Sequence, residues 1–254
     1  MLNNTFDNQS EPIITPELIY GKRNKIADIC IITFSHVVRD NILTTFECTE
    51  EAVMGSANGP TPIYSLQYKG LKVLFYMTII GSSGAGTCIE EAHCLTGATK
   101  FIMFGSAGIL DKEITAGKAL VPTEAYRDEG FSYHYAPAED YITIKNSGLV
   151  AAAFDEMGIP YVLGKTWTTD AIFRETRNNM EARKAEGCLA VEMECAGAQA
   201  VCDYRGIDYY DFLISGDLLD SPEWDRRILG GEEERTHQLK NFYIALELAL
   251  ILSR

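Results

Sequence analysis

The chain has 254 residues, which suits one large α/β domain or two small ones. Hydrophobic residues make up 46% and charged residues 23% of it, a composition typical of globular proteins that excludes a wholly disordered chain. The formal net charge of −14 argues against non-specific binding to nucleic acid, which needs clustered Lys and Arg, but it allows a local basic pocket for an anion such as phosphate.

Seven apolar segments predict strands: 27–34, 71–80, 100–106, 118–125, 161–167, 188–193 and 208–215. Several of them are continuously apolar, as expected of strands that are covered on both faces. The patterns that follow predict four helices: 86–98, 147–158, 194–206 and 233–254. Strand and helix alternate, so the sequence predicts an α/β fold with helices on both faces of a sheet.

The chain shows no internal repeat, low-complexity tract or linker, so we expect a single domain over residues 21–254. An irregular N-terminal arm is expected over residues 1–20. No apolar run approaches the roughly 20 residues of a membrane span, and the N-terminus lacks the pattern of a signal peptide. We therefore expect a cytoplasmic protein with no membrane partner.

The seven cysteines show no CxxC pair and no zinc-type spacing. They are most simply small, reduced and buried residues of a cytoplasmic protein. The weaker alternative is a metal site formed by Cys88, His93 and Cys94, whose spacing fits no common ligand set. We therefore expect no metal.

Two glycine-containing loops follow predicted strands, where open α/β sheets bind ligands. The stretch "GSSGAGT" (81–87), with Gly84 at its centre, could hold an anion on backbone N–H groups, or it could be a tight turn. In "FGSAG" (104–108), Ser106 offers a hydroxyl and Gly105 allows close backbone approach. An ordinary loop explains this second stretch equally well.

Two later stretches combine acids with aromatic residues. In "TWTTDAIFRETR" (166–177), Phe173 could stack on a flat ring and Arg174 could bind the edge of that ring; alternatively, a helix starts there. In "LISGDLLDSPEW" (213–224), Asp217 is either a helix cap or an acid whose pKa an apolar site raises.

The stretch "LAVEMECAGAQAV" (189–201) places Glu192, Met193 and Glu194 where a predicted strand runs into a predicted helix. A glutamate in the first turn of a helix gains roughly 0.3–1 kcal/mol from the helix dipole. Capping is therefore one explanation for the two acids, and a binding site is the other.

In their order along the chain, these segments resemble the nucleoside phosphorylase family of the purine nucleoside and uridine phosphorylase type. "AVEMECAGAQAV" looks like its V-E-M-E-[AS]-A segment, "FGSAGIL" like its G-[TS]-x-G loop, and "TTDAIFRE" and "ISGDLLD" like two further elements. "DEGFSYHYAP" (128–137) resembles a uridine phosphorylase loop. The resemblance implies a three-layer fold, with a central mixed β-sheet flanked by helices, over residues 21–254.

The resemblance also implies roles for individual residues. Glu194 would accept hydrogen bonds from the ribose hydroxyls and Met193 would pack on the sugar, with Glu192 nearer the base. Asp217 would protonate the leaving base, although Gly216 separates it from Ser215 where the family has Ser-Asp. Phe173 would stack on the base, Arg174 would contact it, and Ser106, Gly105 and the glycine loop with Gly84 would hold the anion.

The expected phosphate site departs from the family pattern. "TFSHVVRD" (33–40) stands where the family has Gly-Asp-Pro-x-Arg, and Met103 stands where it has an arginine. Phosphate could be bound by relocated cations, such as Arg39, Arg127 or an arginine of a partner subunit. Alternatively, water is the nucleophile, with His36 as a possible base.

We therefore expect a nucleoside phosphorylase that yields free base and ribose 1-phosphate, with inorganic phosphate as co-substrate and no cofactor. A nucleosidase that uses water and a non-catalytic nucleoside-binding protein are the alternatives. The 128–137 loop favours uridine, whereas an acid at Asp217 favours a purine. Family members are oligomers, so the resemblance implies a homo-oligomer, such as a dimer or hexamer.

Overall fold

The computed structural model describes residues 5–21, 24–57, 59–227 and 232–254, and it places ten strands there in one mixed sheet. The strands are β1 (Ile29–Thr33), β2 (Thr49–Ser56), β3 (Gly59–Tyr68), β4 (Leu71–Met77), β5 (Lys100–Ile109), β6 (Ala119–Asp128), β7 (Tyr141–Thr143), β8 (Tyr161–Thr169), β9 (Cys188–Glu192) and β10 (Asp208–Leu218). The α-helices are α1 (Pro16–Tyr20), α2 (His36–Thr45), α3 (Ser82–Thr96), α4 (Lys112–Thr115), α5 (Ser147–Met157), α6 (Arg177–Ala185), α7 (Cys195–Arg205) and α8 (Glu232–Leu252). Two short 3₁₀ turns are η2 (Ser132–His134) and η3 (Ile172–Arg174).

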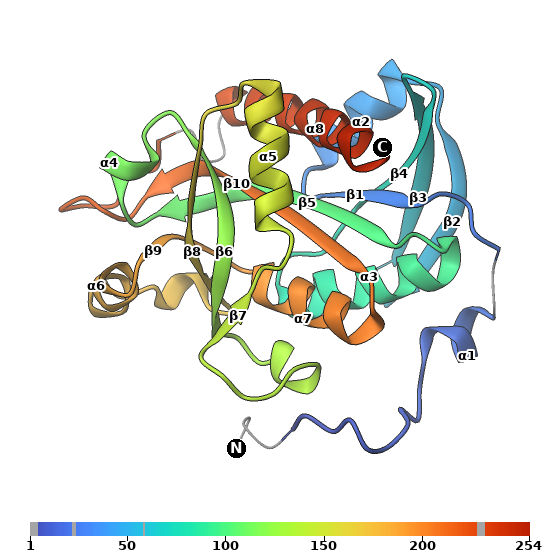
Figure 1. Ribbon diagram of the computed structural model, residues 1–254, viewed down its shortest axis with the longest axis horizontal. Coiled ribbons are helices and arrows are strands. Elements are labelled where there is room, and N and C mark those ends of the chain that lie inside the picture. Colours follow the sequence, from blue (N-terminus) through green and yellow to red (C-terminus); the bar gives the residue numbers. More distant parts are fainter. Residues whose placement is uncertain (1–4, 22–23, 58, 228–231) are drawn as a thin grey trace.

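One half of the sheet is closed into a ring. The strand order is β10-β6-β8-β9-β5-β1-β4-β3-β2, and β10 also pairs with β5 in parallel. Five strands, β5, β10, β6, β8 and β9, therefore form a small barrel, from which β1, β4, β3 and β2 extend as an open sheet (Figure 1). The long strand β5 belongs to both parts, because it pairs with β1, β9 and β10.

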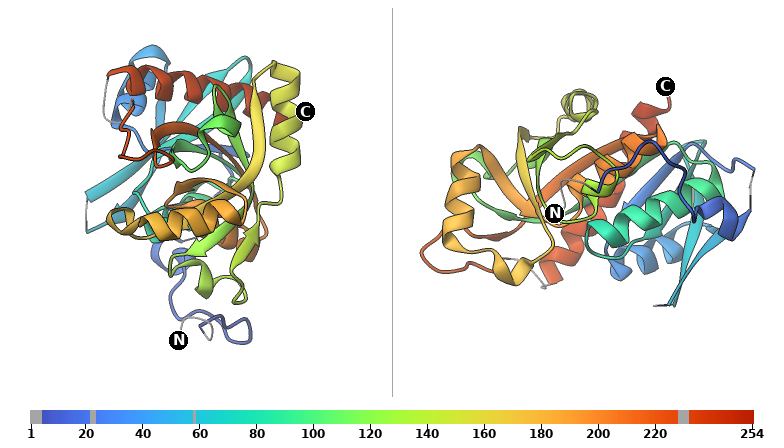
Figure 2. Two further views of the ribbon diagram at one scale, coloured as in Figure 1. Left: turned by 90° about the vertical axis from the view of Figure 1, so that its left-hand side faces the viewer. Right: turned by 90° about the horizontal axis from the view of Figure 1, so that it is seen from below.

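Helices cover both faces of the sheet, because successive apolar residues of the central strands point to opposite faces and all of them are buried. On β1, Ile29 and Ile31 face a core shared with α2, α5 and α8, whereas Cys30 and Ile32 face a core shared with α3 and α7. Figure 2 shows the resulting three layers from two further directions. A third cluster, which includes Leu120, fills the barrel interior.

All seven predicted strands and all four predicted helices are present, within a few residues of the predicted ends. The sequence did not predict the antiparallel strands β2, β3 and β7, which carry many polar or exposed residues. Two of them, β2 and β7, lie at edges of the sheet, and β3 lies between β2 and β4. The sequence also did not predict α1, α2, α4 and α6. The arm expected to be irregular contains α1, where the Thr15 hydroxyl caps the helix and the Tyr20 hydroxyl donates to Glu91.

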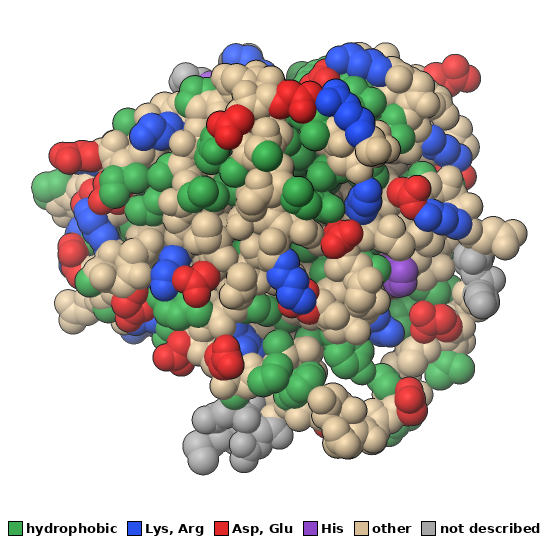
Figure 3. Space-filling view, in the orientation of Figure 1, with side chains coloured by type: hydrophobic (Ala, Val, Ile, Leu, Met, Phe, Trp, Pro, Cys, Tyr) green, Lys and Arg blue, Asp and Glu red, His purple; other side chains and the backbone are tan. Residues whose placement is uncertain are grey.

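Acidic and basic side chains are interspersed on the face seen in Figure 3. Many acids pair locally with basic residues; Lys72, for example, lies 2.7 Å from Glu51. Within the described ranges, no helix is both long and apolar enough to cross a membrane.

Candidate active site

A cavity of about 660 Å³ opens where several strands reach their carboxyl ends. Its wall includes residues from the ends of β1, β9 and β10, the second half of β5, the segment around η3, and α8. In α/β sheets this is the edge at which ligands bind. The cavity brings together seven of the residues that the sequence analysis selected: Gly105, Ser106, Phe173, Glu192, Met193, Glu194 and Asp217.

Glu192 caps helix α7. Its Oε2 accepts hydrogen bonds from the backbone N–H groups of Glu194 and Cys195, at 2.7 and 2.6 Å. Its Oε1 accepts from the hydroxyls of Thr168 and Thr166, at 2.5 and 3.3 Å. A carboxylate has about four acceptor positions, so all of them are occupied by protein donors. The base contact that the resemblance implies for Glu192 would therefore have to displace a bond that holds the helix.

Glu194 is held differently and keeps half of its acceptor capacity. Its Oε1 accepts the Gly81 N–H at 2.7 Å and its Oε2 accepts the Met193 N–H at 3.2 Å. The described residues donate no other hydrogen bond to it, so about two acceptor positions remain at the cavity wall. Burial, together with the negative charge of Glu192, raises the pKa of Glu194 to about 8. This carboxyl group is therefore oriented, buried and able to accept two more donors.

The structure changes the interpretation of the glycine-rich stretch 81–87. Helix α3 already begins at Ser82, so Gly84 lies inside the helix and outside the cavity wall. A Cβ atom on Gly84 would lie 2.9 Å from the Ile79 side chain, and one on Gly86 would lie 2.2 Å from the Phe131 ring. These glycines permit close packing, and the Gly81 N–H binds Glu194 instead of an anion.

Asp217 reaches the cavity through a β-bulge in β10. In the pairing with β5, Ser215 lies opposite Ala107 and Asp217 lies opposite Gly108, so Gly216 is the extra residue. The insertion noticed in the sequence is thus absorbed locally, and Asp217 occupies the register position directly after Ser215. The Trp224 Nε1–H donates to Asp217 Oδ2 at 2.6 Å and fixes that carboxylate.

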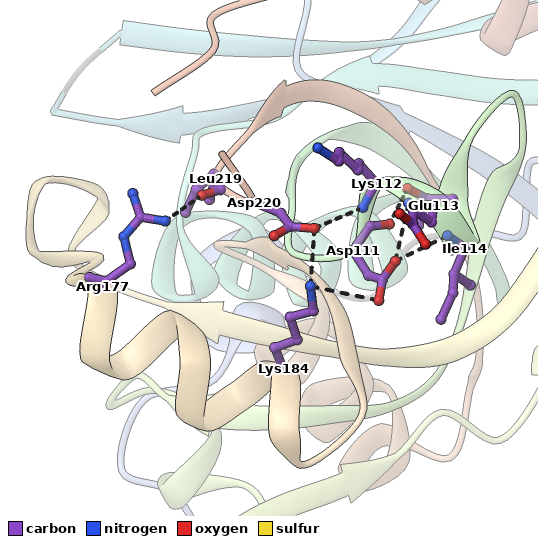
Figure 4. Close-up of polar contacts among 9 residues, drawn as sticks. Asp111, Lys112, Glu113, Ile114, Arg177, Lys184, Leu219 and Asp220 are labelled. Carbon is purple, nitrogen blue, oxygen red and sulfur yellow. Dashed lines mark hydrogen bonds and ion pairs between the residues drawn. The ribbon is translucent and has the colours of Figure 1, made fainter. Parts of the chain in front are cut away.

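The loop that follows Asp217 is tied to α6. Lys184 Nζ lies 3.0 Å from Asp220 Oδ2, and the Arg177 guanidinium donates to the backbone carbonyls of Leu219 and Pro222 at 3.2 and 3.3 Å. Figure 4 shows these side chains reaching from α6 towards the loop. Only two residues separate η3 from helix α6. The contacts of α6 therefore connect the η3 segment to the loop after Asp217, and both of these segments border the cavity.

Phe173 and Arg174 differ in their placement. Phe173 lines the cavity mouth with its side chain 96% exposed, so it is available to a ligand or to a neighbouring chain. Arg174 is exposed and does not line the cavity.

Cations are scarce where an anion was expected. Met103 is buried at the cavity wall. Arg39, one candidate substitute, lies outside the cavity wall, and its Nε donates to Asp40 Oδ1 at 2.8 Å. The buried Arg127, the other candidate, donates to Ser132 and to backbone carbonyls of the 128–140 loop. His36 also lies outside the cavity wall. Among the described wall residues, Arg177 is the one Lys or Arg.

The sequence did not identify four wall residues whose side chains can be charged or donate hydrogen bonds: Glu175, Arg177, Trp224 and His237. Glu175 and Arg177 follow Phe173 within the stretch that was quoted for it, so their neighbourhood was the available signal. Trp224 ends the stretch that contains Asp217. His237 lies on the polar part of α8 and carries no signal in the sequence.

The buried Asp211 on β10 lies behind the capped end of α7. Neither of its oxygens has a hydrogen bond of ordinary geometry to the described residues, although the Cys195 thiol and the Tyr209 hydroxyl lie close by. Burial and the charge of Glu192 raise the pKa of Asp211 well above its usual value. The native state thus favours a protonated Asp211.

We expect Asp211→Asn to flatten the pH dependence of stability. In the unfolded chain the Asp211 carboxyl ionises near pH 4, whereas the native state retains its proton, so stability from this group is lost as pH rises above 4. The slope is at most about 1.4 kcal/mol per pH unit for one proton. Urea unfolding at pH 5, 6, 7 and 8 measures it. Parallel curves for the variant and the wild type would contradict a raised pKa.

No cluster of three or more His, Cys, Asp or Glu side chains within residues 5–21, 24–57, 59–227 and 232–254 is arranged to hold a metal ion. His93 Nδ1 instead lies 2.7 Å from the Ala98 carbonyl oxygen.

A family model described as the phosphorylase superfamily matches residues 28–250. The chain belongs to the phosphorylase superfamily. It is 26% identical over 242 residues to a protein named purine nucleoside phosphorylase DeoD-type from Alkaliphilus metalliredigens, covering 91% of this chain and 98% of that protein. It is also 26% identical over 215 residues to a protein of the same name from Caldanaerobacter subterraneus subsp. tengcongensis, covering 84% and 88%.

As a member of the phosphorylase superfamily, this chain combines a mixed sheet covered by helices with a cavity at the strand ends. The two acids of its V-E-M-E segment differ in their contacts: Glu192 caps α7, and Glu194 has acceptor positions left at the cavity wall.

Proposed function

We propose that this chain cleaves the N-glycosidic bond of a purine ribonucleoside and transfers the ribosyl group to inorganic phosphate, giving free purine and ribose 1-phosphate. The observation that carries the proposal is the state of Glu194. Gly81 and Met193 fix this carboxylate, and two of its acceptor positions remain at the cavity wall. The 2′- and 3′-hydroxyls of ribose supply two donors side by side.

The other wall residues suit the remaining steps. As the bond from the sugar to the base breaks, positive charge develops on the ribose, and a nearby carboxylate such as Glu194 stabilises it. Met193 lines the cavity beside Glu194 and offers an apolar surface to the sugar. Phe173 would stack on the base, and Asp217 would give it a proton.

A purine is the better candidate for the base. The relatives that match most of the chain are named purine nucleoside phosphorylases. A carboxylic acid at Asp217 suits a leaving group that is protonated on a ring nitrogen. The 128–137 loop, which resembles a uridine phosphorylase loop, contributes no residue to the cavity wall.

Phosphate would lie against Ser106 and the backbone of Gly105. Two observations favour water as the alternative nucleophile. Met103 stands at the wall where the resemblance implies a cation, and the guanidinium of Arg177 donates to loop carbonyls. Four acidic side chains, Glu175, Glu192, Glu194 and Asp217, also line the wall, and each of them disfavours a divalent anion when it is ionised. The second candidate is therefore a purine nucleosidase of the same fold. A protein that binds nucleosides without cleaving them is the third.

We also propose that the chain forms a homo-oligomer, as the resemblance implies, in which a neighbouring subunit supplies the missing cation. Four large apolar side chains at the cavity mouth are well exposed: Ile80, Ile172, Phe173 and Trp224. Exposed apolar groups of this kind mark surfaces that bind ligands or other chains.

One assay separates the candidates. The protein is incubated with inosine, adenosine and uridine, with and without phosphate, and free base and ribose 1-phosphate are quantified. Phosphate-dependent release of a purine with ribose 1-phosphate supports the proposal, and phosphate-independent release supports the nucleosidase. Binding of inosine without release would leave only the non-catalytic role, and release of uracil alone would contradict the choice of a purine.

A further inference from the structure

Asn241 is a buried amide of the cavity wall to which the resemblance assigns no role. It lies on α8, is 6% exposed, and lines the cavity. No residue that the structure describes donates a hydrogen bond to its carboxamide or accepts one from it. Buried polar side chains are nearly always hydrogen-bonded, so this carboxamide is available to a ligand.

The side chain of Asn241 is what this residue can offer to the cavity. Its backbone N–H and C=O groups lie well inside the long helix α8, where they form the hydrogen bonds of the helix. His237 lies four residues earlier, on the same face of α8, and also lines the cavity. This face of α8 therefore forms one side of the cavity.

Helix α8 and strand β5 run in opposite directions, as Figure 1 shows, so Asn241 lies towards the carboxyl end of the strand. Lys100 Nζ, at the start of β5, donates to the Leu252 carbonyl oxygen at 2.6 Å. From this contact, Asn241 lies about 16 Å back along α8, and Ser106 lies about 20 Å forward along β5. Asn241 and Ser106 are therefore at similar heights along the two elements.

Ser106 also points to the side of the sheet that α8 covers. Phe104 packs in the core shared with α8, and its ring centroid lies 6.3 Å from that of Phe242. Side chains two residues apart on a strand point to the same face, so Ser106 follows Phe104. The same alternation on β1 places Thr33 on this face. Thr33, Ser106 and Asn241 thus line one end of the cavity from the same side of the sheet.

These three side chains are uncharged and can all donate hydrogen bonds. Thr33 Oγ1 accepts the Ser35 N–H at 3.3 Å, which leaves its own O–H to donate. The Asn241 NH₂ group has two N–H bonds. A hydrogen bond to an ionised acceptor is roughly twice as strong as one between neutral groups, so uncharged donors can hold an anion.

We propose that Asn241 binds the phosphate co-substrate, with its NH₂ group donating to a phosphate oxygen beside Ser106 and Thr33. This inference rests on the proposed function. It gives the anion a donor from the chain's own helix α8, at a wall where Met103 stands in place of the expected cation. A carboxamide also adds no negative charge to a wall that already holds four acidic side chains.

The test titrates potassium phosphate into the protein in the presence of 9-deazainosine and follows the heat by calorimetry. The base of this nucleoside is joined to the ribose by a carbon–carbon bond, so it occupies the site without being cleaved. Asn241→Leu, which has a similar volume and no donors, should raise the Kd for phosphate about 10- to 100-fold. Its Kd for 9-deazainosine should stay within about twofold of the wild type, which shows that the variant is folded.

Three further variants complete the design. Asn241→Ala removes the same donors without filling the site and should show the same loss, which guards against misfolding of either variant. Asn241→Gln keeps the NH₂ group and should bind phosphate within about fivefold of the wild type. Asn178→Leu, the same change at an exposed position of α6, should leave both dissociation constants unchanged.

The outcomes separate this inference from the proposed function. If Asn241→Leu and Asn241→Ala bind phosphate like the wild type, or lose affinity for both ligands equally, this inference alone is wrong. A wild-type protein that binds phosphate through Asn241 but releases no base from inosine contradicts the proposed function alone. A wild-type protein with no measurable affinity for phosphate overturns both.

Discussion

Glu194→Ala is expected to lower kcat/KM for inosine by about 10²–10⁴-fold. The variant loses two hydrogen bonds from the ribose to a charged acceptor, each contributing about 1.5–3 kcal/mol. Base release under saturating phosphate measures the effect. Glu113→Ala, an exposed glutamate on α4, is the matched control and should be fully active. Full turnover by Glu194→Ala would remove the ribose assignment for phosphorolysis and hydrolysis alike.

The pH dependence of binding gives a second view of the same carboxyl group. The pKa of Glu194 is about 8 in the empty site, so below pH 8 most molecules carry it protonated. Ribose hydroxyls donate to the ionised form, and nucleoside affinity should therefore rise as pH increases from 6 to 8. Titration calorimetry would follow this rise and the accompanying release of a proton. Glu194→Gln should bind weakly with no such slope, and an equal slope in this variant would point to another group.

Glu192→Ala is expected to destabilise the protein by about 2–4 kcal/mol. Its carboxylate accepts two backbone N–H groups at the start of α7 and two buried threonine hydroxyls, and alanine leaves these donors without an acceptor. Urea unfolding measures the loss. Glu192→Gln is the control: its oxygen can accept the N–H groups and its NH₂ group can donate to the hydroxyls, so we expect about 1 kcal/mol.

The two Glu192 variants also test the role that the resemblance implies. A residue that only caps α7 changes stability, whereas a residue that binds the base changes the preference among nucleosides. If Glu192→Ala folds with wild-type stability and altered base preference, the capping role is wrong.

The sequence predicted best those elements that depend on residue type and on neighbouring residues in the chain. Apolar segments, several of them continuous runs, identified seven of the strands, because such segments are buried wherever they are placed. Gly97 and Gly158 end α3 and α5 in the left-handed conformation that glycine adopts without strain, and both lie at or next to the predicted helix ends. Edge strands such as β2, by contrast, expose many of their side chains, so their pattern resembles that of a loop.

The site residues that lie in local motifs were predicted, whereas features that depend on distant segments were not. The ordered motifs selected Ser106, Glu194 and Asp217, and the structure brings these three residues to one cavity. Nothing in the sequence showed that Gly216 is a bulge, because a bulge is defined by the partner strand β5. Glu175 was missed because the resemblance assigns it no role, and the cavity wall that it shares with Asp217 forms only in the folded chain.

The sequence by itself therefore determined the α/β class, the family resemblance and the candidate acids Glu192, Glu194 and Asp217, because these depend on residue type and order. Only the tertiary structure decided which hydrogen-bond donors each acid meets. Glu192 and Glu194 are two residues apart, yet one faces the N–H groups of α7 and two threonines, and the other faces Gly81 and the cavity. A carboxylate takes its role from the donors and charges that surround it, and most of those come from segments far away in the chain.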